Sequence, residues 1–163
     1  MNKIRTFAER LLLSPLHPFL FSVYFVFRMY AFNVHDIPFL DFIRPLLLSV
    51  LIAGAFGLLF FLFVRSWHTT AYMTSALLFM FYLYDLVRRL LLSKIRFIDS
   101  SSFALIWVLL ALVLITWIGW RKHTIQDRAI LAGTNLIAII LLLFPTMQAL
   151  RYFIVKKIHF HRK

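Results

Sequence analysis

Long apolar runs alternate with short polar stretches along the whole chain. A helix that crosses a membrane needs about 20 predominantly apolar residues. Five segments come close to that length, and they cover residues 11–33, 45–64, 70–92, 103–120 and 130–150. The pattern therefore predicts an all-α protein: about five transmembrane helices form one polytopic bundle, a single membrane domain, and a basic tail follows over residues 151–163.

The stretches between these segments are too short to hold an independent domain. Pro38 and Pro45 are predicted to mark the first loop and the start of the second helix, since proline suits loops and first helical turns. Asp99 and the serines at 100–102 predict a turn that leads into a helix N-cap. The basic N-terminus is similar to that of a signal peptide, but the apolar run behind it is too long and too interrupted, so a retained helix is expected.

The composition is typical of a membrane protein. The hydrophobic content is 63%, well above the roughly 45–50% of soluble domains. The sequence has no Cys, which excludes a disulfide framework and a thiolate metal site. The net charge of +12 comes from short groups of Lys and Arg that separate the apolar runs. This arrangement favours contacts with anionic lipid headgroups and argues against a nucleic-acid partner.

The positive charges give two conflicting indications of orientation. Three basic residues precede the first segment, and only Arg44 lies in the loop after it, so the positive-inside rule places the N-terminus in the cytoplasm. Five crossings then place the C-terminus outside. With that topology the outer side carries ten Lys and Arg and the inner side seven, so the complete count opposes the rule based on the first helix.

Two charged residues fall inside predicted spans. Arg28 lies in the outward half of the first span and Asp85 in the outward half of the third. Because an ionisable group in hydrocarbon is costly and normally faces a partner, one hypothesis is an Arg28–Asp85 ion pair between the two helices. In the alternative, Arg28 extends to the membrane interface and Asp85 pairs locally with Arg88 or Arg89 at helical spacing.

A structural role is predicted for His17, which lies between Pro15 and Pro18. Its imidazole is expected to form hydrogen bonds with backbone carbonyls that the prolines leave free. A haem would require a second inward-facing His at matching depth, and the spacing of the histidines supports no metal site. Asn135 and Gln148 could form hydrogen bonds between helices or bind a ligand, and packing is the expected use. Asn33, at the end of the first span, is expected to be a structural polar residue.

Small residues at Ala53, Gly54 and Gly57 predict that another helix approaches the second span closely. The sequence offers no comparable pattern for catalysis. Its six acidic residues are scattered singly, and its four glycines form no phosphate-binding loop. We therefore predict no catalytic, cofactor-binding or metal-binding residues, and we do not expect an enzyme.

Several motifs occur in order along nearly the whole chain: HPFLF at 17–21, Tyr24, YAFN at 30–33, RPLLLS at 44–49, FMFYLYD at 79–85 and NLIAIILLLFPTMQ at 135–148. Together they resemble the N-terminal membrane domain of bacterial sulfatase-like hydrolases of the alkaline-phosphatase superfamily. The resemblance implies a helical membrane domain, then an extracytoplasmic hydrolase with a metal site, and hence a C-terminus outside. His17 and Asn33 fit the shared pattern, whereas Arg28 does not. No residue matches the metal ligands or nucleophile of such a hydrolase, so no activity is implied.

The sequence thus predicts a non-catalytic membrane anchor or interaction subunit in the bacterial cytoplasmic (inner) membrane, associated with another membrane or envelope protein. Lys156 and Lys157 are expected to bind anionic headgroups if the tail lies along the membrane surface; the tail could equally form a frayed linker. Other hypotheses are a small transporter or lipid-handling protein, an integral subunit of an electron-transfer or photosynthetic complex, and a truncated or split hydrolase. The transporter would be lined by Arg28, Asn135 and Gln148.

Overall fold

The computed structural model describes residues 12–92, 99–121 and 128–160. Within these ranges the chain forms helices and no strands, which confirms the all-α class. The helices are α2 (His17–Phe32), α3 (Phe39–Val64), α4 (Trp67–Leu92), α5 (Ser100–Trp120) and α6 (Arg128–Phe160).

Four of these helices, α3 to α6, are long and apolar enough to cross a membrane. The chain is therefore a multi-pass helical membrane protein. Helix α2 has 16 residues, so it is about 24 Å long and shorter than the roughly 30 Å hydrocarbon core of a bilayer. The first of the five predicted spans is thus a shorter helix than the sequence pattern indicated.

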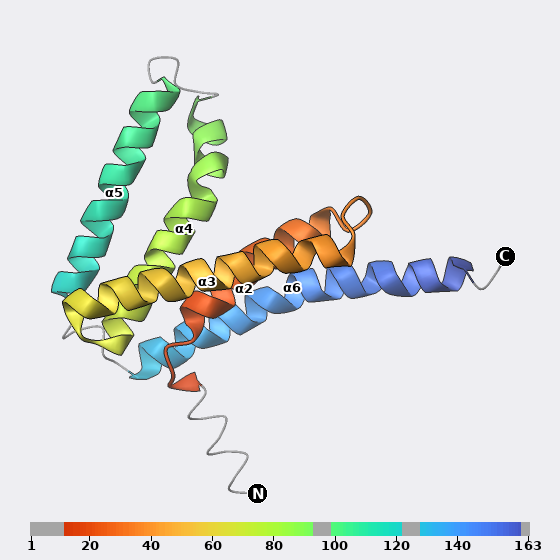
Figure 1. Cartoon of the computed structure of the whole chain (residues 1–163), viewed down its shortest axis with the longest axis horizontal. Coiled ribbons are helices and arrows are strands. Elements are labelled where there is room, and N and C mark those ends of the chain that lie inside the picture. The colour runs from red at the N-terminus through yellow and green to blue at the C-terminus, as the bar shows by residue number, and fades with distance from the viewer. Residues whose placement is uncertain (1–11, 93–98, 122–127, 161–163) are drawn as a thin grey trace, which may run out of the picture.

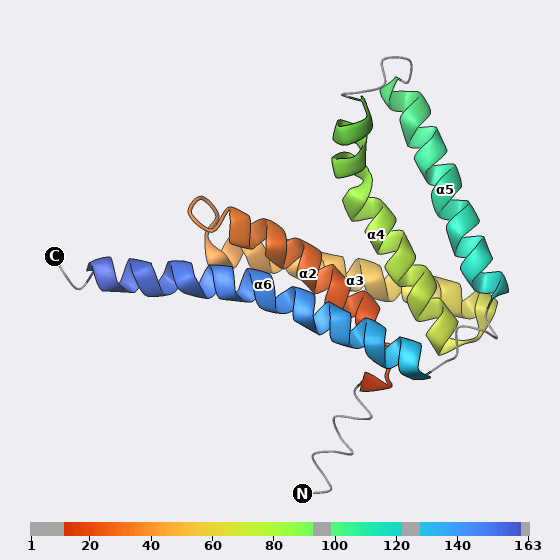
Figure 2. The same cartoon turned by 180° about the vertical axis from the view of Figure 1, so that it is seen from behind.

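The helices form two groups (Figures 1 and 2). Helices α2, α3 and α6 lie side by side, whereas α4 and α5 form a hairpin that stands at a steep angle to them. Helix α2 is the central element, since it packs against α3, α4 and α6. Helix α5 packs against α4, at the far side of the hairpin from α2.

Two helix starts differ from the predictions. The first segment was predicted as a helix from residue 11, but α2 begins at His17, and Pro18 occupies its first turn. Proline at that place sacrifices no helical hydrogen bond. Helix α3 begins at Phe39, directly after Pro38, so Pro45 lies inside the helix and does not start it. A single interior proline is tolerated in membrane helices, where neighbouring helices can satisfy the freed carbonyl.

The predictions for the later helices had mixed outcomes. Asp99 is the N-cap of α5, as expected, and its carboxylate accepts hydrogen bonds from the backbone N–H groups of Ser101 and Ser102. Helix α6 continues as one helix to Phe160, through most of the residues predicted as a basic tail. Residues 161–163 and the side chains of Lys156 and Lys157 lie outside the described part of the chain, so the predicted headgroup contacts remain a prediction.

An aromatic core surrounds α2. Phe21 contacts Phe79 of α4 with ring centroids 4.7 Å apart, and Phe25 stacks on Tyr82 of α4 at 4.4 Å. Nearer the end of α2, Tyr30 stacks on a ring of α3 at 4.5 Å. Offset and edge-on aromatic pairs of this kind are each worth about 0.5–1.5 kcal/mol beyond their burial. The rings therefore hold α2 between α3 and α4.

The predicted close approach at the glycines of α3 is confirmed. A Cβ atom at Gly54 would lie 3.8 Å from the ring of Phe19 in α2, and one at Gly57 would lie 3.7 Å from the Thr74 hydroxyl in α4. Both distances are ordinary van der Waals contacts, so a methyl group fits at either position. Gly133 of α6 differs, because no neighbouring atom lies within 4 Å of a Cβ placed there.

These contacts predict the effect of side-chain size at Gly57. Gly57→Ala should leave the melting temperature in detergent unchanged or raise it, because the methyl group fits and alanine favours helix. Gly57→Leu should lower stability by about 1–3 kcal/mol by pushing α3 and α4 apart. The matched control is Gly133→Leu, which should be tolerated. Equal losses for the two leucine variants would contradict this account of the α3–α4 contact.

Candidate functional site

A buried polar cluster lies where α2 and α4 begin. His17 is completely buried, and a hydrogen bond of 2.7 Å joins its Nδ1 to the hydroxyl of Ser75. Its ring also packs against Tyr72 with centroids 4.7 Å apart. A structural role for His17 was predicted, but with the wrong partner: the imidazole binds a side chain of α4 and not a carbonyl freed by the prolines. Tyr72 and Ser75 are three positions apart and therefore lie on one face of α4, so both can contact His17.

Asn135 satisfies the carbonyls that precede α2. Its side-chain amide donates hydrogen bonds of 2.7 Å to the carbonyl of Leu12 and 2.6 Å to that of Ser14. Asn135 belongs to α6 and is 1% exposed. The predicted packing role of this residue is thus confirmed. Asn135, and not His17, forms the hydrogen bonds with backbone carbonyls before α2. These bonds attach the entry of α2 to α6.

A second buried contact joins three helices further along α2. The Ser49 hydroxyl of α3 donates to the carbonyl of Ser22 in α2 at 3.2 Å and lies 2.7 Å from the Tyr82 hydroxyl of α4. The sequence analysis missed Ser49, Tyr82 and Ser75. The available signal was the concentration of hydroxyl residues in the first half of α4 (Thr69, Thr70, Thr74 and Ser75), an apolar helix in which each of them needs a partner.

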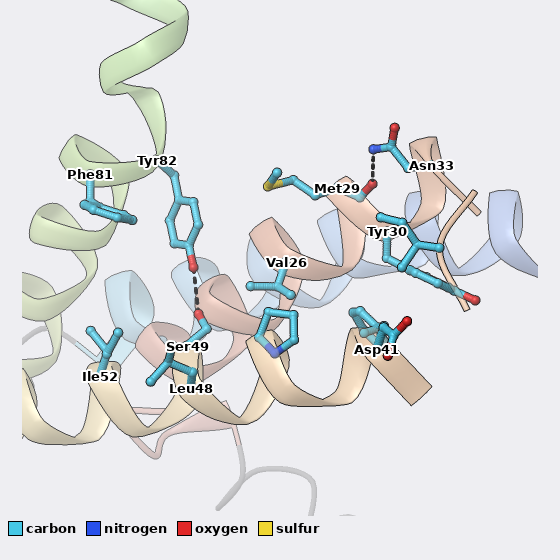
Figure 3. Close-up of a pocket in the computed structure, with 13 residues that line it drawn as sticks. Val26, Met29, Tyr30, Asn33, Asp41, Leu48, Ser49, Ile52, Phe81 and Tyr82 are labelled. Atoms are coloured by element: carbon cyan, nitrogen blue, oxygen red, sulfur yellow. Dashed lines mark hydrogen bonds between the residues drawn. The ribbon is translucent and has the colours of Figure 1, made fainter. Parts of the chain in front are cut away.

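An apolar wedge opens beyond the Ser49–Tyr82 contact, where α4 leaves the other helices (Figure 3). This cavity of about 400 Å³ is enclosed by α2, α3 and α4, and its lining residues are Val26, Met29, Tyr30, Asn33, Ile37, Asp41, Phe42, Pro45, Leu48, Ser49, Ile52, Phe81 and Tyr82. Asn33 and Asp41 lie at the end of the wedge away from Tyr82. The wedge is therefore mainly apolar, with the bonded hydroxyls of Ser49 and Tyr82 at one end and the exposed polar residues Asn33 and Asp41 at the other.

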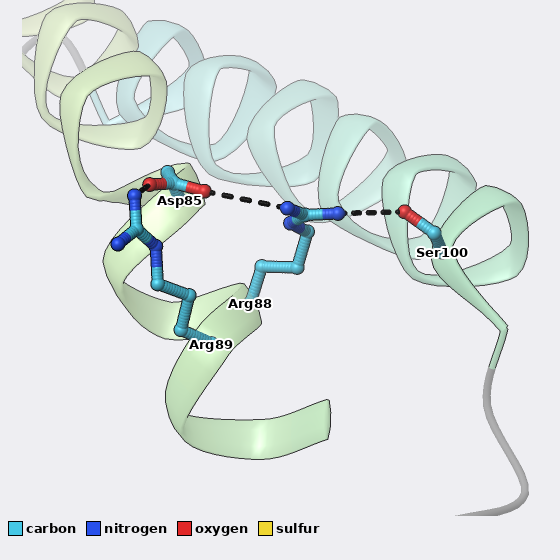
Figure 4. A network of polar contacts seen from close by, with 4 residues as sticks. All are labelled: Asp85, Arg88, Arg89 and Ser100. Atoms are coloured by element: carbon cyan, nitrogen blue, oxygen red, sulfur yellow. Dashed lines mark hydrogen bonds and ion pairs between the residues drawn. The ribbon is translucent and has the colours of Figure 1, made fainter. Parts of the chain in front are cut away.

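Asp85 forms a local ion-pair network in α4 (Figure 4). Its carboxylate pairs with Arg89 and, at 3.5 Å, with Arg88, which also donates to the Ser100 hydroxyl of α5 at 3.0 Å. Among the described residues no ion pair joins Arg28 to Asp85, so that hypothesis is wrong, and the alternative of a local pairing of Asp85 is confirmed. The physical reason is that α4 diverges from α2 after Tyr82, whereas the hypothesis assumed parallel helices. The extension of Arg28 to the membrane interface remains a prediction.

Arg28 lies on the side of α2 opposite to the wedge, at an exposed groove between α2 and α6. Its guanidinium donates to the Tyr24 hydroxyl at 3.3 Å and lies 5.7 Å from the centre of the Phe32 ring. Both partners are uncharged. Within the described parts of the chain, no carboxylate pairs with Arg28.

The two remaining predicted polar residues do not connect helices. Asn33 is the C-cap residue of α2, and its side-chain amide donates to the carbonyl of Met29 at 2.7 Å. It therefore has a structural role at a helix end. Gln148 lines a surface hollow formed by α6 residues, and within the described chain it makes no interhelical hydrogen bond, contrary to prediction. The reason is its position on a face of α6 that no other described helix covers at this hollow.

The electrostatics outside the spans are simple. The hydroxyl of Ser102, followed by the backbone N–H groups of Ser101 and Ser102, holds the pKa of Asp99 below its usual value. In the described segments no three His, Cys, Asp or Glu residues gather as a metal-binding group. Comparison with known protein families, with curated proteins and with solved structures gives no match for the chain.

The His17–Ser75 bond gives a test of the buried cluster. Ser75→Ala leaves a buried imidazole nitrogen without its partner and should destabilise the protein by about 1–3 kcal/mol, measured by unfolding in mixed detergent micelles. Ser22→Ala is the matched control, because the hydroxyl of this equally buried serine bonds only within its own helix, to Phe19 at 2.8 Å. A loss for Ser22→Ala as large as that for Ser75→Ala would mean that the interhelical bond contributes nothing specific.

Proposed function

We propose that this protein is a non-catalytic anchor or interaction subunit of the bacterial cytoplasmic membrane, and that it binds a membrane-embedded helix of a cell-envelope enzyme or larger complex. The N-terminus faces the cytoplasm in this proposal. The observation that carries it is the wedge, because α2, α3 and α4 present packed side chains there to a space that no described part of the chain fills.

The chemistry of the wedge suits a helix. Helices associate in lipid through close van der Waals packing and a few polar contacts, since lipid tails are as apolar as leucine. Met29 and Leu48 are 63% and 58% exposed, and they offer the wedge large apolar side chains from two different helices. Asn33 and Asp41, at the polar end, would meet polar or basic groups of the partner near the headgroups.

The transporter hypothesis receives less support. It requires Arg28, Asn135 and Gln148 to line one water-accessible cavity near the middle of the membrane. Asn135 is instead buried against the carbonyls before α2, while Arg28 and Gln148 lie at surface hollows. The polar groups that could contact a substrate are thus engaged in packing or distributed over the outside of the bundle.

The proposal can be tested by photocrosslinking in cells. A crosslinking amino acid at position 29 or 48 is expected to give the same discrete protein adduct from both sides of the wedge. Matched controls are positions Leu105 and Val113 of α5, which are 64% and 66% exposed and do not line the wedge. These controls should yield lipid adducts only.

Two results would contradict the proposal. The first is an identical set of adducts from the wedge and from the α5 controls, which would indicate non-specific neighbours. The second is turnover of a substrate by the purified chain alone. If the partner is confirmed, filling the wedge with Leu48→Trp should weaken its co-purification, while Leu105→Trp should not.

A further inference from the structure

The groove between α2 and α6 combines an apolar surface with one exposed cation. Its volume is about 560 Å³, and its lining residues are Tyr24, Arg28, Ile140, Leu141, Leu143, Phe144 and Met147. Every lining residue except Arg28 is apolar or aromatic. A groove of this composition in a membrane helix pair matches an acyl chain, and its single guanidinium matches an anion next to that chain.

The position of Arg28 along α2 determines the depth in the membrane at which this anion would bind. Arg28 lies four residues before the end of α2 at Phe32, which is about 6 Å along the helix axis. A long arginine side chain at such a place can extend to the headgroup region while its stem covers apolar surface. A phosphate at the headgroup level near this end of α2 would then be within reach of the guanidinium.

A second cation continues the same surface. A neighbouring hollow on α6 shares Phe144 and Met147 with the groove and adds Gln148 and Arg151. Arg151 follows Met147 by one helical turn, so both lie on one face of α6. No acidic residue lines the groove or the hollow. The groove and the hollow together thus carry the guanidinium groups of Arg28 and Arg151 and the amide of Gln148 beside one apolar strip.

The lack of a carboxylate distinguishes this surface from the charged end of α4. Arg88 and Arg89 share the carboxylate of Asp85 within their own helix. Arg28 has only the Tyr24 hydroxyl and the Phe32 ring as partners among the described residues. An uncompensated guanidinium at a membrane surface favours a phosphate, which can accept two parallel hydrogen bonds from it.

We propose that this surface is a binding site for an anionic phospholipid. Arg28 and Arg151 hold the headgroup phosphate, Gln148 donates to a headgroup oxygen, and an acyl chain lies along Ile140, Phe144 and Met147. The site is separate from the wedge and does not depend on a protein partner.

The test measures lipid binding to the purified full-length chain in a non-ionic detergent, by native mass spectrometry and by thermal stabilisation. Phosphatidylglycerol should bind and raise the melting temperature. Phosphatidylcholine with the same acyl chains should bind more weakly, because its net charge is zero. Inorganic phosphate should not stabilise the protein, because it lacks the chain that fills the groove.

The variants assign the binding to these residues. Arg28→Gln and Arg151→Gln should each weaken phosphatidylglycerol binding by roughly five- to tenfold, and the double variant by more. Arg28→Lys keeps the charge without the bidentate geometry and should have a smaller effect. The matched control is Arg121→Gln, since Arg121 is also exposed and lies 5.6 Å from the centre of the Trp117 ring, but lines neither hollow.

Several outcomes would overturn the proposal. Equal losses for Arg28→Gln and Arg121→Gln would show attraction to the overall positive charge. Equal binding of phosphatidylcholine would show a chain-binding groove without headgroup recognition, and stabilisation by inorganic phosphate alone would show an anion site that needs no lipid. The melting temperature of each variant without lipid identifies any that fail to fold; if Arg28→Gln is one of them, Arg151→Gln and Arg28→Lys decide the question.

Discussion

The structure depends on one constraint, which is that polar groups inside a membrane must find partners within the protein. Helix α2 is short and carries two buried polar side chains, His17 and Ser22, and the first half of α4 carries four more. Ser75 of α4, Ser49 of α3 and Asn135 of α6 each form a hydrogen bond with α2 or with the residues just before it. These bonds attach the three longer helices to α2, which becomes the centre of the bundle.

The same bonds explain why the hairpin of α4 and α5 stands apart. Helix α4 is attached to α2 at Ser75 and again at Tyr82, which stacks on Phe25 and bonds to Ser49. Beyond Tyr82 the polar side chains of α4 are Asp85, Arg88 and Arg89, which pair with one another and with Ser100 of α5. These polar contacts do not hold this part of α4 against α2, and here the helix packs against α5. The wedge is the space that this divergence leaves.

The sequence was sufficient to predict what depends on local pattern. Apolar length predicted the helices, Asp99 predicted a cap, and Gly54 and Gly57 predicted a close helix contact. Pairing of polar groups could not be predicted, because it depends on helix directions in space. The assumption of parallel helices produced the wrong Arg28–Asp85 pair, and the roles expected of His17 fell partly to Asn135, which is 118 positions away in the sequence. Hydropathy likewise could not show that α6 continues through the basic residues after position 150.

The two exposed surfaces assigned here lie on opposite faces of α2. Successive residues of a helix are separated by about 100° around its axis, so Tyr24 and Arg28 share one face, which borders α6, while Val26, Tyr30 and Asn33 lie across the helix and line the wedge. A lipid at the first face and a protein helix at the second would therefore not compete for space. Both surfaces border the same aromatic core, because Tyr24 of the groove and Tyr82 of the wedge each contact the ring of Phe25. A subunit built in this way can hold its partner and its surrounding lipid in a defined orientation to each other, which is the property that an anchor requires.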